Sequence, residues 1–400
     1  MPPDNTDFSA AASALGYIYQ PRYALFSLFR LPETTECWIE RDDDIDFSDP
    51  GEGQILASLK HKAEGDALSD LSPDFWKSVR IWAIRYLEDP TPTNRDRYFL
   101  FTTGAVTVGS LLEDFLPNKD KSVDLATRSL EKLAESGSKT LAKTRLELEK
   151  LTEDQQHDFF RRVVIFDHQV RIQNIPQHII DERFRTVRIQ FRDAVYQRLE
   201  GWWFSECIKL LAGNRTTPLR GSEVSEMLSF ISEQFREENL PIDFEDAEPD
   251  EGVHPDTDDR NFVRQLRAIG LKSERIKRAI LDYYRACQQR GEWLRLNVTL
   301  NGEIERYDDR LVDEWARLKE VVWEELNNDA PEETLQQLGR KLYTDLSTRD
   351  HPNLRIRRDV AATYVAMGSY HHLANDQRPR VHWHPQFESR IAEILGQETL

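Results

Sequence analysis

The chain has 400 residues and a formal net charge of −18 at pH 7, with 39% hydrophobic and 31% charged residues. This length allows two or three domains, and the charge argues against a protein that coats nucleic acid by bulk electrostatics. No apolar run approaches the length that crosses a bilayer, and we expect no secretory signal at the N-terminus. The three cysteines are widely spaced and fit no zinc or disulfide pattern. We therefore expect a cytoplasmic protein without a membrane segment.

The N-terminal region is expected to hold a leader, a helix and two strands. Residues 1–10 are predicted to form a flexible leader, and a helical pattern follows over about 11–30. Two adjacent strands come next, separated by a turn over 48–53 that is rich in Pro and Gly. The first strand begins at Trp38 and becomes acidic along its length. The second covers 54–60 and ends in a lysine.

The acidic strand and the lysine of its neighbour form a candidate hydrolytic site. Residues two apart on a strand share a face, so Ser58 should lie on the same face as Lys60. Mg²⁺ takes one or two protein carboxylates and keeps several waters, and a lysine beside it can orient the attacking water. An acidic run beside a turn is most often a solvated loop, which is the alternative to a metal site. The acids expected to share one face are Glu40, Asp42, Asp44 and Asp46, with Asp43 on the other.

Further motifs flank this pair of strands, whose order is the one found in PD-(D/E)xK nucleases. They are GYIYQ at 16–20, SLKHK at 58–62, LSDLSPDFWKSVRIW at 68–82, YFLFTT at 98–103, GSYHHLA at 368–374 and WHP at 383–385. The succession over about 11–167 resembles the N-terminal endonuclease domain of the CBASS-associated double-stranded-DNA nucleases (the DUF4297 group). It is most similar to the LmuA family, the nuclease effector subunits of Lamassu and related ABC-three-component anti-phage systems.

The resemblance implies roles for individual residues. Lys60 corresponds to the catalytic lysine, Glu40 and Asp44 to the leading metal ligands, and Asp46 to a further one. The implied cofactor is Mg²⁺, for which Mn²⁺ substitutes, and the implied substrate is double-stranded DNA. Gln20 corresponds to a helix-borne Gln or Glu that many relatives place near the metal. Lys62, Lys77 and Arg80 are further accessory candidates; Lys77 and Arg80 lie off an apolar helix face and could contact DNA, although a solvated position is the more common role of such residues.

One position departs from the family pattern. The wider superfamily carries Glu, Asp or Gln two residues before the lysine, whereas this chain has Ser58. A hydroxyl is a weaker metal ligand than a carboxylate, so more of the coordination would come from the acids or from water. Ser58 therefore keeps open the alternative of a catalytically degenerate scaffold or binding subunit. An RNase or a nickase on the same fold is a further alternative.

We expect an α+β protein with two domains. A PD-(D/E)xK-like domain with a mixed sheet and flanking helices should span 11–180, and a mostly α-helical association or regulatory domain should span 181–400. Residues 163–166 fit either a short strand or the end of a helix. The stretch 237–259 contains many carboxylates, three prolines and no Lys or Arg, which favours an extended or mobile linker.

The C-terminal part concentrates histidine. Such clusters suggest zinc, but no helical His-x-x-x-His pair and no nearby cysteine accompanies them, so polar packing or partner contacts are favoured. These residues are His351, His371, His372, His382 and His384.

The chain lacks a P-loop and a Gly-rich dinucleotide loop. ATP use, if the system needs it, then belongs to another subunit. The resemblance implies an SMC-like ATPase partner (LmuB-like), a small third subunit (LmuC-like) and a homo-oligomer when active. Regulation by assembly would protect the host from indiscriminate DNA cleavage.

Overall fold

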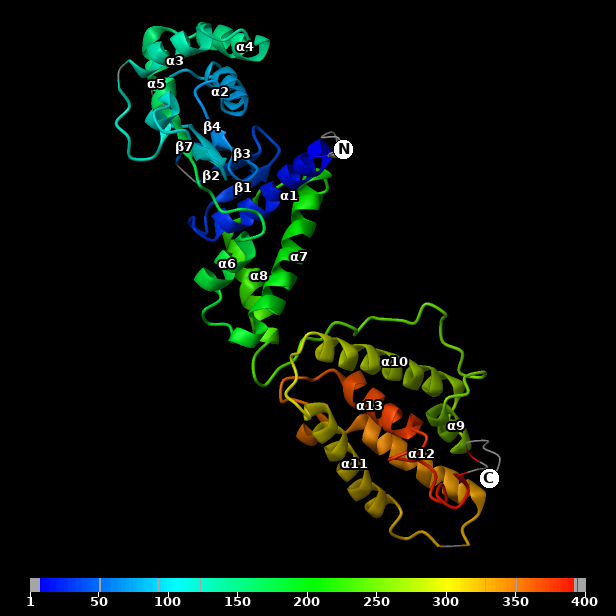
Figure 1. The fold of residues 1–400 in the computed structure, drawn as a ribbon. Helices are drawn as coiled ribbons and strands as arrows, with labels where there is room; N and C mark the ends of the chain where they lie inside the picture. The colour runs from blue at the N-terminus through cyan, green and yellow to red at the C-terminus, as the bar shows by residue number, and fades with distance from the viewer. Residues whose placement is uncertain are drawn as a thin grey trace, which may run out of the picture. The chain divides into compact units, whose positions relative to one another are not determined.

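The structure is a computed structural model that divides into two compact units, Met1–Ile231 and Ser232–Leu400 (Figure 1). It describes residues 8–49, 52–91, 94–122, 124–327, 329–349, 351–391 and 394. Most of the predicted leader lies outside these residues, and helix α1 (Phe8–Leu28) begins within it. No helix in the described ranges combines the length and the apolar character that a membrane crossing requires.

The first unit is built on a six-stranded mixed sheet with the strand order β7-β5-β3-β2-β1-β8. Strands β3, β5 and β7 are parallel, and the pairs β3–β2, β2–β1 and β1–β8 are antiparallel. The expected mixed sheet is therefore confirmed. The strands are β1 (Glu36–Ile39), β2 (Ile45–Ser48), β3 (Ile55–Lys60), β5 (Arg97–Thr102), β7 (Val163–Phe166) and β8 (Leu219–Arg220), beside a small sheet of β4 (Ala67–Leu68) and β6 (Ala105–Val106).

The acidic residues do not continue the first strand, so the expected alternation of their side chains is wrong. Strand β1 ends at Ile39, which pairs with Ile45 at the start of β2, and residues 40–44 form the turn between them. Glu40 has a φ of 54°, in the left-handed region that interrupts a strand. Its N–H donates to the carbonyl oxygen of Asp44 over 3.2 Å and closes the turn.

One face of the sheet packs against a group of helices that encloses the main core of this unit (Figure 1). Helix α2 (Pro73–Tyr86) buries Phe75, Val79 and Trp82, whose spacing of three and four residues is that of an apolar helix face. Residues 163–166 form β7, which resolves the choice between strand and helix. The remaining elements of this group are η1 (Leu111–Phe115), α3 (Leu125–Ala134), α4 (Lys139–Leu148) and α5 (Glu153–Arg162).

Residues beyond 180 also belong to the first unit, whereas the sequence placed a domain boundary at 180/181. Helix α7 (Arg192–Leu211) runs beside α1 (Figure 1), and Trp203 Nε1 donates to the carbonyl oxygen of Pro21 over 2.6 Å. Strand β8 then pairs with β1. These contacts join segments distant in sequence, which local composition does not reveal. The other elements here are α6 (Ile175–Arg183), η2 (Ile189–Phe191) and α8 (Gly221–Gln234).

The second unit is helical, as expected for the C-terminal part. Helix α10 (Ser273–Arg295) and helix α13 (Thr363–Asn375) approach closely at Gly368, where a Cβ atom would lie 2.1 Å from the carbonyl oxygen of Asp282. The remaining helices are α9 (Asn261–Ala268), α11 (Glu303–Val322), α12 (Glu332–Thr348) and η3 (Pro352–Leu354).

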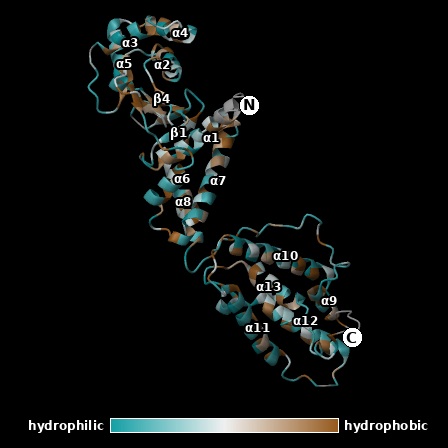
Figure 2. Cartoon of the chain, in the orientation of Figure 1, coloured by the Kyte–Doolittle hydropathy of each residue, from teal (hydrophilic) through white to brown (hydrophobic). Residues whose placement is uncertain are grey.

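The acidic stretch 237–259 forms no helix or strand and is mostly hydrophilic in Figure 2. It is nevertheless held on α10. Trp293 Nε1 donates to the carbonyl oxygen of Pro241 over 2.7 Å, and Arg285 Nε donates to that of Ala247 over 2.9 Å. The stretch is therefore a packed part of the second unit rather than the free linker that its composition suggested.

Candidate active site

Lys60 ends β3 beside Asp44, which comes from the turn between β1 and β2. Its Nζ lies 3.4 Å from Asp44 Oδ2 and donates to Ser58 Oγ over 2.9 Å. The N–H of Leu59 donates to the same Asp44 oxygen over 2.7 Å, which fixes the carboxylate against β3. The Lys60 and Asp44 side chains remain 25% and 21% exposed. This ion pair is therefore anchored and still open to solvent.

Gln20 of α1 joins Asp44 to Glu40. Its Nε2 donates to Glu40 Oε1 over 2.7 Å and to Asp44 Oδ1 over 2.9 Å. The Gln20 side chain is buried, so packing fixes the position of its amide. The structure thus brings the predicted lysine, two of the predicted carboxylates and the predicted glutamine into one cluster.

Ser58 lies beneath this cluster and is almost completely buried. Its Oγ is 3.3 Å from Asp44 Oδ2 and 2.8 Å from Ser78 Oγ of α2. Sequence reasoning missed Ser78. Its place three residues after Phe75 and four before Trp82, on the buried face of α2, is the signal that could have found it.

Asp46 does not join the Lys60 cluster. Only 1% of the residue is exposed, and its Oδ2 accepts the N–H of Asp42 over 2.9 Å. Burial raises the pKa of Asp46 to about 7, although the hydrogen bond from Asp42 opposes this rise. Its other carboxylate oxygen has no partner in the part of the chain that the structure describes. Asp46 is therefore buried beneath the turn between β1 and β2 and is not exposed on the surface of that turn.

Asp43 is held by α2 through Trp82, whose Nε1 donates to Asp43 Oδ2. Burial, followed by the charge of Asp44, raises the pKa of Asp43 to about 6. Trp82 therefore fixes the acidic turn to the core, a role that its apolar spacing on the helix did not reveal.

Three lysines surround Asp74 in the first turn of α2. Lys62 forms an ion pair with Asp74. Burial alone would raise the pKa of this carboxyl group, but Lys62, with smaller contributions from Lys60 and Lys77, holds it below its ordinary value. The Lys77 side chain is exposed, whereas Arg80 is half-buried. Lys60, Lys62 and Lys77 therefore lie near one carboxylate, and Lys62 is already paired with it.

The donor set around Gln20 is compatible with a small, hard cation. No group of three or more His, Cys, Asp or Glu side chains arranged to hold a metal ion occurs among the described residues. Glu40 and Asp44 nevertheless direct one carboxylate oxygen each toward the same nitrogen. Mg²⁺ is commonly held by one or two carboxylates with water completing its shell. Glu40 and Asp44 therefore suit Mg²⁺ better than a metal ion whose ligands must all come from protein side chains.

The C-terminal histidines pack against aromatic rings. His371 is completely buried between Phe262 and Tyr343, with ring centroids 5.2 and 5.9 Å away. Burial, followed by the charge of Arg260, lowers the pKa of His371 to about 3. His382 stacks on Phe387 at 5.0 Å. This arrangement supports packing rather than metal binding for both residues.

Comparison with known proteins bears mainly on the second unit. The structure of Acinetobacter baumannii Cap4, a SAVED/CARF-domain containing receptor with the cyclic trinucleotide 2'3'3'-cAAA, has 14% sequence identity and a TM-score of 0.36. The similarity covers 68% of this chain and 58% of that chain, and so weak a likeness does not establish a common fold. No curated protein matches the chain. Residues 262–391 match the family model of C-terminal domain 7 of the ABC-three component (ABC-3C) systems, which supports membership of the chain in such a multi-component system.

Proposed function

We propose that this chain is the metal-dependent DNA endonuclease subunit of an ABC-three-component anti-phage defence system. The observation that carries the proposal is the convergence of Glu40, Asp44 and Lys60 around the end of β3. The family match in the second unit supports the defence system and the presence of partner subunits.

The first unit is proposed to be a PD-(D/E)xK-like nuclease domain. Its carboxylates come from the turn before β2, and its lysine ends β3, the strand that pairs with β2. A mixed sheet in contact with α1 and α2 supports these residues. The order of acidic segment, turn and lysine-bearing strand is that of the nuclease pattern.

Each side chain has a distinct role in the proposed hydrolysis of phosphodiester bonds. Glu40 and Asp44 would hold Mg²⁺, and Gln20 would keep both carboxylates in place. The bound ion would activate water and stabilise the charge on the leaving oxygen. Lys60 has three N–H donors, of which Asp44 and Ser58 use two among the described residues. The third would orient the attacking water or bind a phosphate oxygen.

The proposed assembly follows from the defence system. The partners would be an SMC-like ATPase subunit and a small third subunit, and the active form would be a homo-oligomer in the cytoplasm. Lys62, Lys77 and Arg80 would contact the DNA backbone near the scissile bond.

The test is cleavage of supercoiled plasmid and linear duplex DNA by the full chain, with Mg²⁺ or EDTA, alone and with its partners. We expect Mg²⁺-dependent cleavage that falls at least about 100-fold in Lys60→Ala. Lys139→Ala, which removes an exposed lysine from α4, should cleave as the wild type does. Undiminished cleavage by Lys60→Ala would refute the site. Absence of cleavage under every condition would refute the nuclease function.

A non-catalytic scaffold is the second candidate. It is favoured by Ser58, which stands where a carboxylate would strengthen metal binding, and by the Gln20 amide between the two acids. Titration calorimetry with Mn²⁺ separates the two functions. A nuclease should bind Mn²⁺, and Glu40→Gln/Asp44→Asn should abolish that binding, whereas a scaffold should show no such site. Cleavage of RNA in a parallel assay would identify an RNase. Accumulation of nicked circular plasmid without linear product would identify a nickase.

A further inference from the structure

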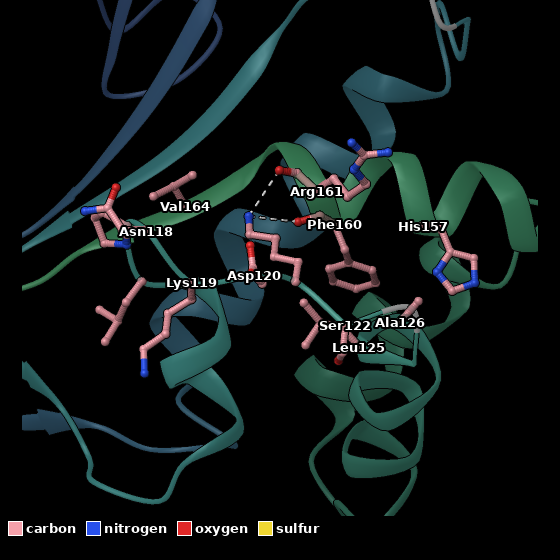
Figure 3. A pocket seen from close by; sticks show the side chains of 13 residues that line it. Asn118, Lys119, Asp120, Ser122, Leu125, Ala126, His157, Phe160, Arg161 and Val164 are labelled. Carbon is pink, nitrogen blue, oxygen red and sulfur yellow. Dashed lines mark hydrogen bonds between the residues drawn. The ribbon is translucent and has the colours of Figure 1, made fainter.

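Two hollows adjoin at the start of β7, away from the Lys60 cluster. The larger has a volume of about 730 Å³ and lies between the loop that precedes α3, the end of α5 and β7 (Figure 3). The smaller, of about 440 Å³, is bordered by the loop that precedes β5. Arg161 and Val164 line both hollows, so the two form one continuous surface.

Unpaired cations gather on this surface. Lys119, Arg95, Arg97 and Arg161 are exposed, and none has a carboxylate partner among the residues that the structure describes. Arg162, which also lines the smaller hollow, is paired with Asp158 at 2.6 Å. The chain as a whole has a net charge of −18, so a group of four cationic side chains without carboxylate partners is unusual for this protein. We call these four residues the β7 basic surface.

The backbone beneath the β7 basic surface is held in place by Lys121. Its Nζ donates to the carbonyl oxygens of Phe160 and Arg161 over 3.2 and 3.1 Å, and also to that of Val163. These bonds tie the loop before α3 to the junction of α5 and β7. Burial, followed by the charge of Arg161, lowers the pKa of Lys121 to about 8. The loop that carries Lys119 is thereby fixed beside Arg161.

We propose that the β7 basic surface binds the phosphate backbone of double-stranded DNA outside the candidate active site. The proposal rests on the proposed nuclease function and extends its DNA footprint. Three of the four cations are arginines, whose planar forks match phosphate oxygens. Between them lie Val164 and the half-exposed Phe99, which offer an apolar floor for sugars. Two acids also line the hollows, Asp96 in the smaller and Asp120 in the larger, and Asp96 already accepts the N–H of Gln54 over 3.0 Å. The four cations still outnumber these two acids, which favours a phosphate backbone as the ligand.

The position of the surface defines its role. Arg97 begins β5 and pairs with Ile55 at the start of β3, whereas Lys60 lies at the other end of β3. Five residues of strand span roughly 17 Å. The β7 basic surface would therefore hold DNA at a distance from the bond that is cleaved, and its loss should weaken binding without removing a catalytic group.

The test compares two double variants of the full chain that remove the same charge, both in a Lys60→Ala background that prevents cleavage. Arg97→Gln/Arg161→Gln alters the β7 basic surface. Lys139→Gln/Lys143→Gln alters two exposed lysines of α4 that lie outside both hollows and have no carboxylate partner among the described residues. Affinity for a fluorescent DNA duplex is measured by anisotropy over a series of salt concentrations, with urea unfolding as a check of folding.

We expect Arg97→Gln/Arg161→Gln to bind the DNA duplex roughly tenfold more weakly than the Lys60→Ala parent. Because two phosphate contacts are lost, the number of counterions released on binding, obtained from the salt dependence of the affinity, should fall by about two. The lysine variant should match the Lys60→Ala parent. Equal binding by both variants overturns the proposal, and so does loss of partner-subunit binding with DNA affinity unchanged. Cleavage by the wild-type chain is measured separately, so the proposed function can survive either outcome.

Discussion

Gln20 and Asp44 are joined by a hydrogen bond of 2.9 Å between Nε2 and Oδ1, although 24 residues separate them in the chain. The same nitrogen contacts Glu40 Oε1 at 2.7 Å. One neutral amide thus offsets the mutual repulsion of two carboxylates at the end of the sheet. This arrangement makes Gln20 a sensitive position for testing whether a cation can occupy the site.

Gln20→Glu should make folding of the first unit dependent on a divalent ion. The substitution removes the donor that two acids share and adds a third negative charge, so we expect a loss of roughly 2 kcal/mol without metal. Mg²⁺ should restore more stability to this variant than to the wild type. Thermal unfolding with Mg²⁺ or EDTA measures both effects. Gln173→Glu, at an exposed position, is the control, and an equal response to Mg²⁺ in all three proteins would argue against a metal site here.

Glu40 should respond to substitution through its backbone as well as its carboxylate. Its φ of 54° lies in the region that glycine adopts without steric cost. Glu40→Gly and Glu40→Ala both remove the carboxylate, so both should lose cleavage. Glu40→Gly should nevertheless be more stable than Glu40→Ala by about 1 kcal/mol in urea unfolding. A more stable alanine variant would show that this turn is not left-handed at Glu40.

Asp46→Asn should change how stability depends on pH. Burial raises the pKa of Asp46 to about 7, so the folded state holds a proton there that the unfolded chain releases near pH 4. The wild type therefore loses stability as pH rises from about 4 to 7, and the asparagine variant should not share that loss. Its advantage over the wild type should be greater at pH 8 than at pH 5.5 by roughly 2 kcal/mol. Urea unfolding at several pH values measures the difference, and a pH-independent difference would contradict the raised pKa.

Gly368→Ala should separate α10 from α13. The added Cβ would lie 2.1 Å from the carbonyl oxygen of Asp282 and 2.4 Å from Ala286 Cβ, so the helices must move apart. We expect a loss of roughly 1–3 kcal/mol in urea unfolding of the full chain. Gly291→Ala in α10, where no atom beyond the adjoining residues and backbone of the same helix lies within 4 Å of the added Cβ, should instead stabilise the helix by up to about 1 kcal/mol. Similar losses in both variants would show that helix packing at Gly368 is not the cause.

The elements that could be predicted have local signals. The apolar spacing of α2 and the lysine at the end of β3 are both visible within short windows of sequence. The predicted alternation of the acidic side chains is wrong because Glu40, whose φ is left-handed, interrupts the chain directly after β1. No adjacent Gly or Pro in the sequence indicates this interruption. Placement of Glu40, Asp44, Gln20 and Lys60 together was expected from the resemblance, and their catalytic roles remain predictions.

The parts that could not be predicted depend on contacts between distant segments. Ser78 joins Ser58, and Trp82 holds Asp43, through side chains whose spacing indicates only a buried helix face. The acidic stretch 237–259 has the composition of a linker, but its backbone carbonyls accept hydrogen bonds from α10. Composition describes the side chains of such a segment and carries little information about partners for its backbone.

The pairing of β8 with β1 determines where this protein can be divided. A fragment ending at residue 180 would lose β8, leaving β1 with unpaired N–H and C=O groups along an open edge. It would also lose α7, whose Trp203 caps the carbonyl of Pro21 inside α1. A transplantable first unit must therefore extend through α8, and a fusion joint belongs after Gln234 rather than at the end of the sheet's last long strand.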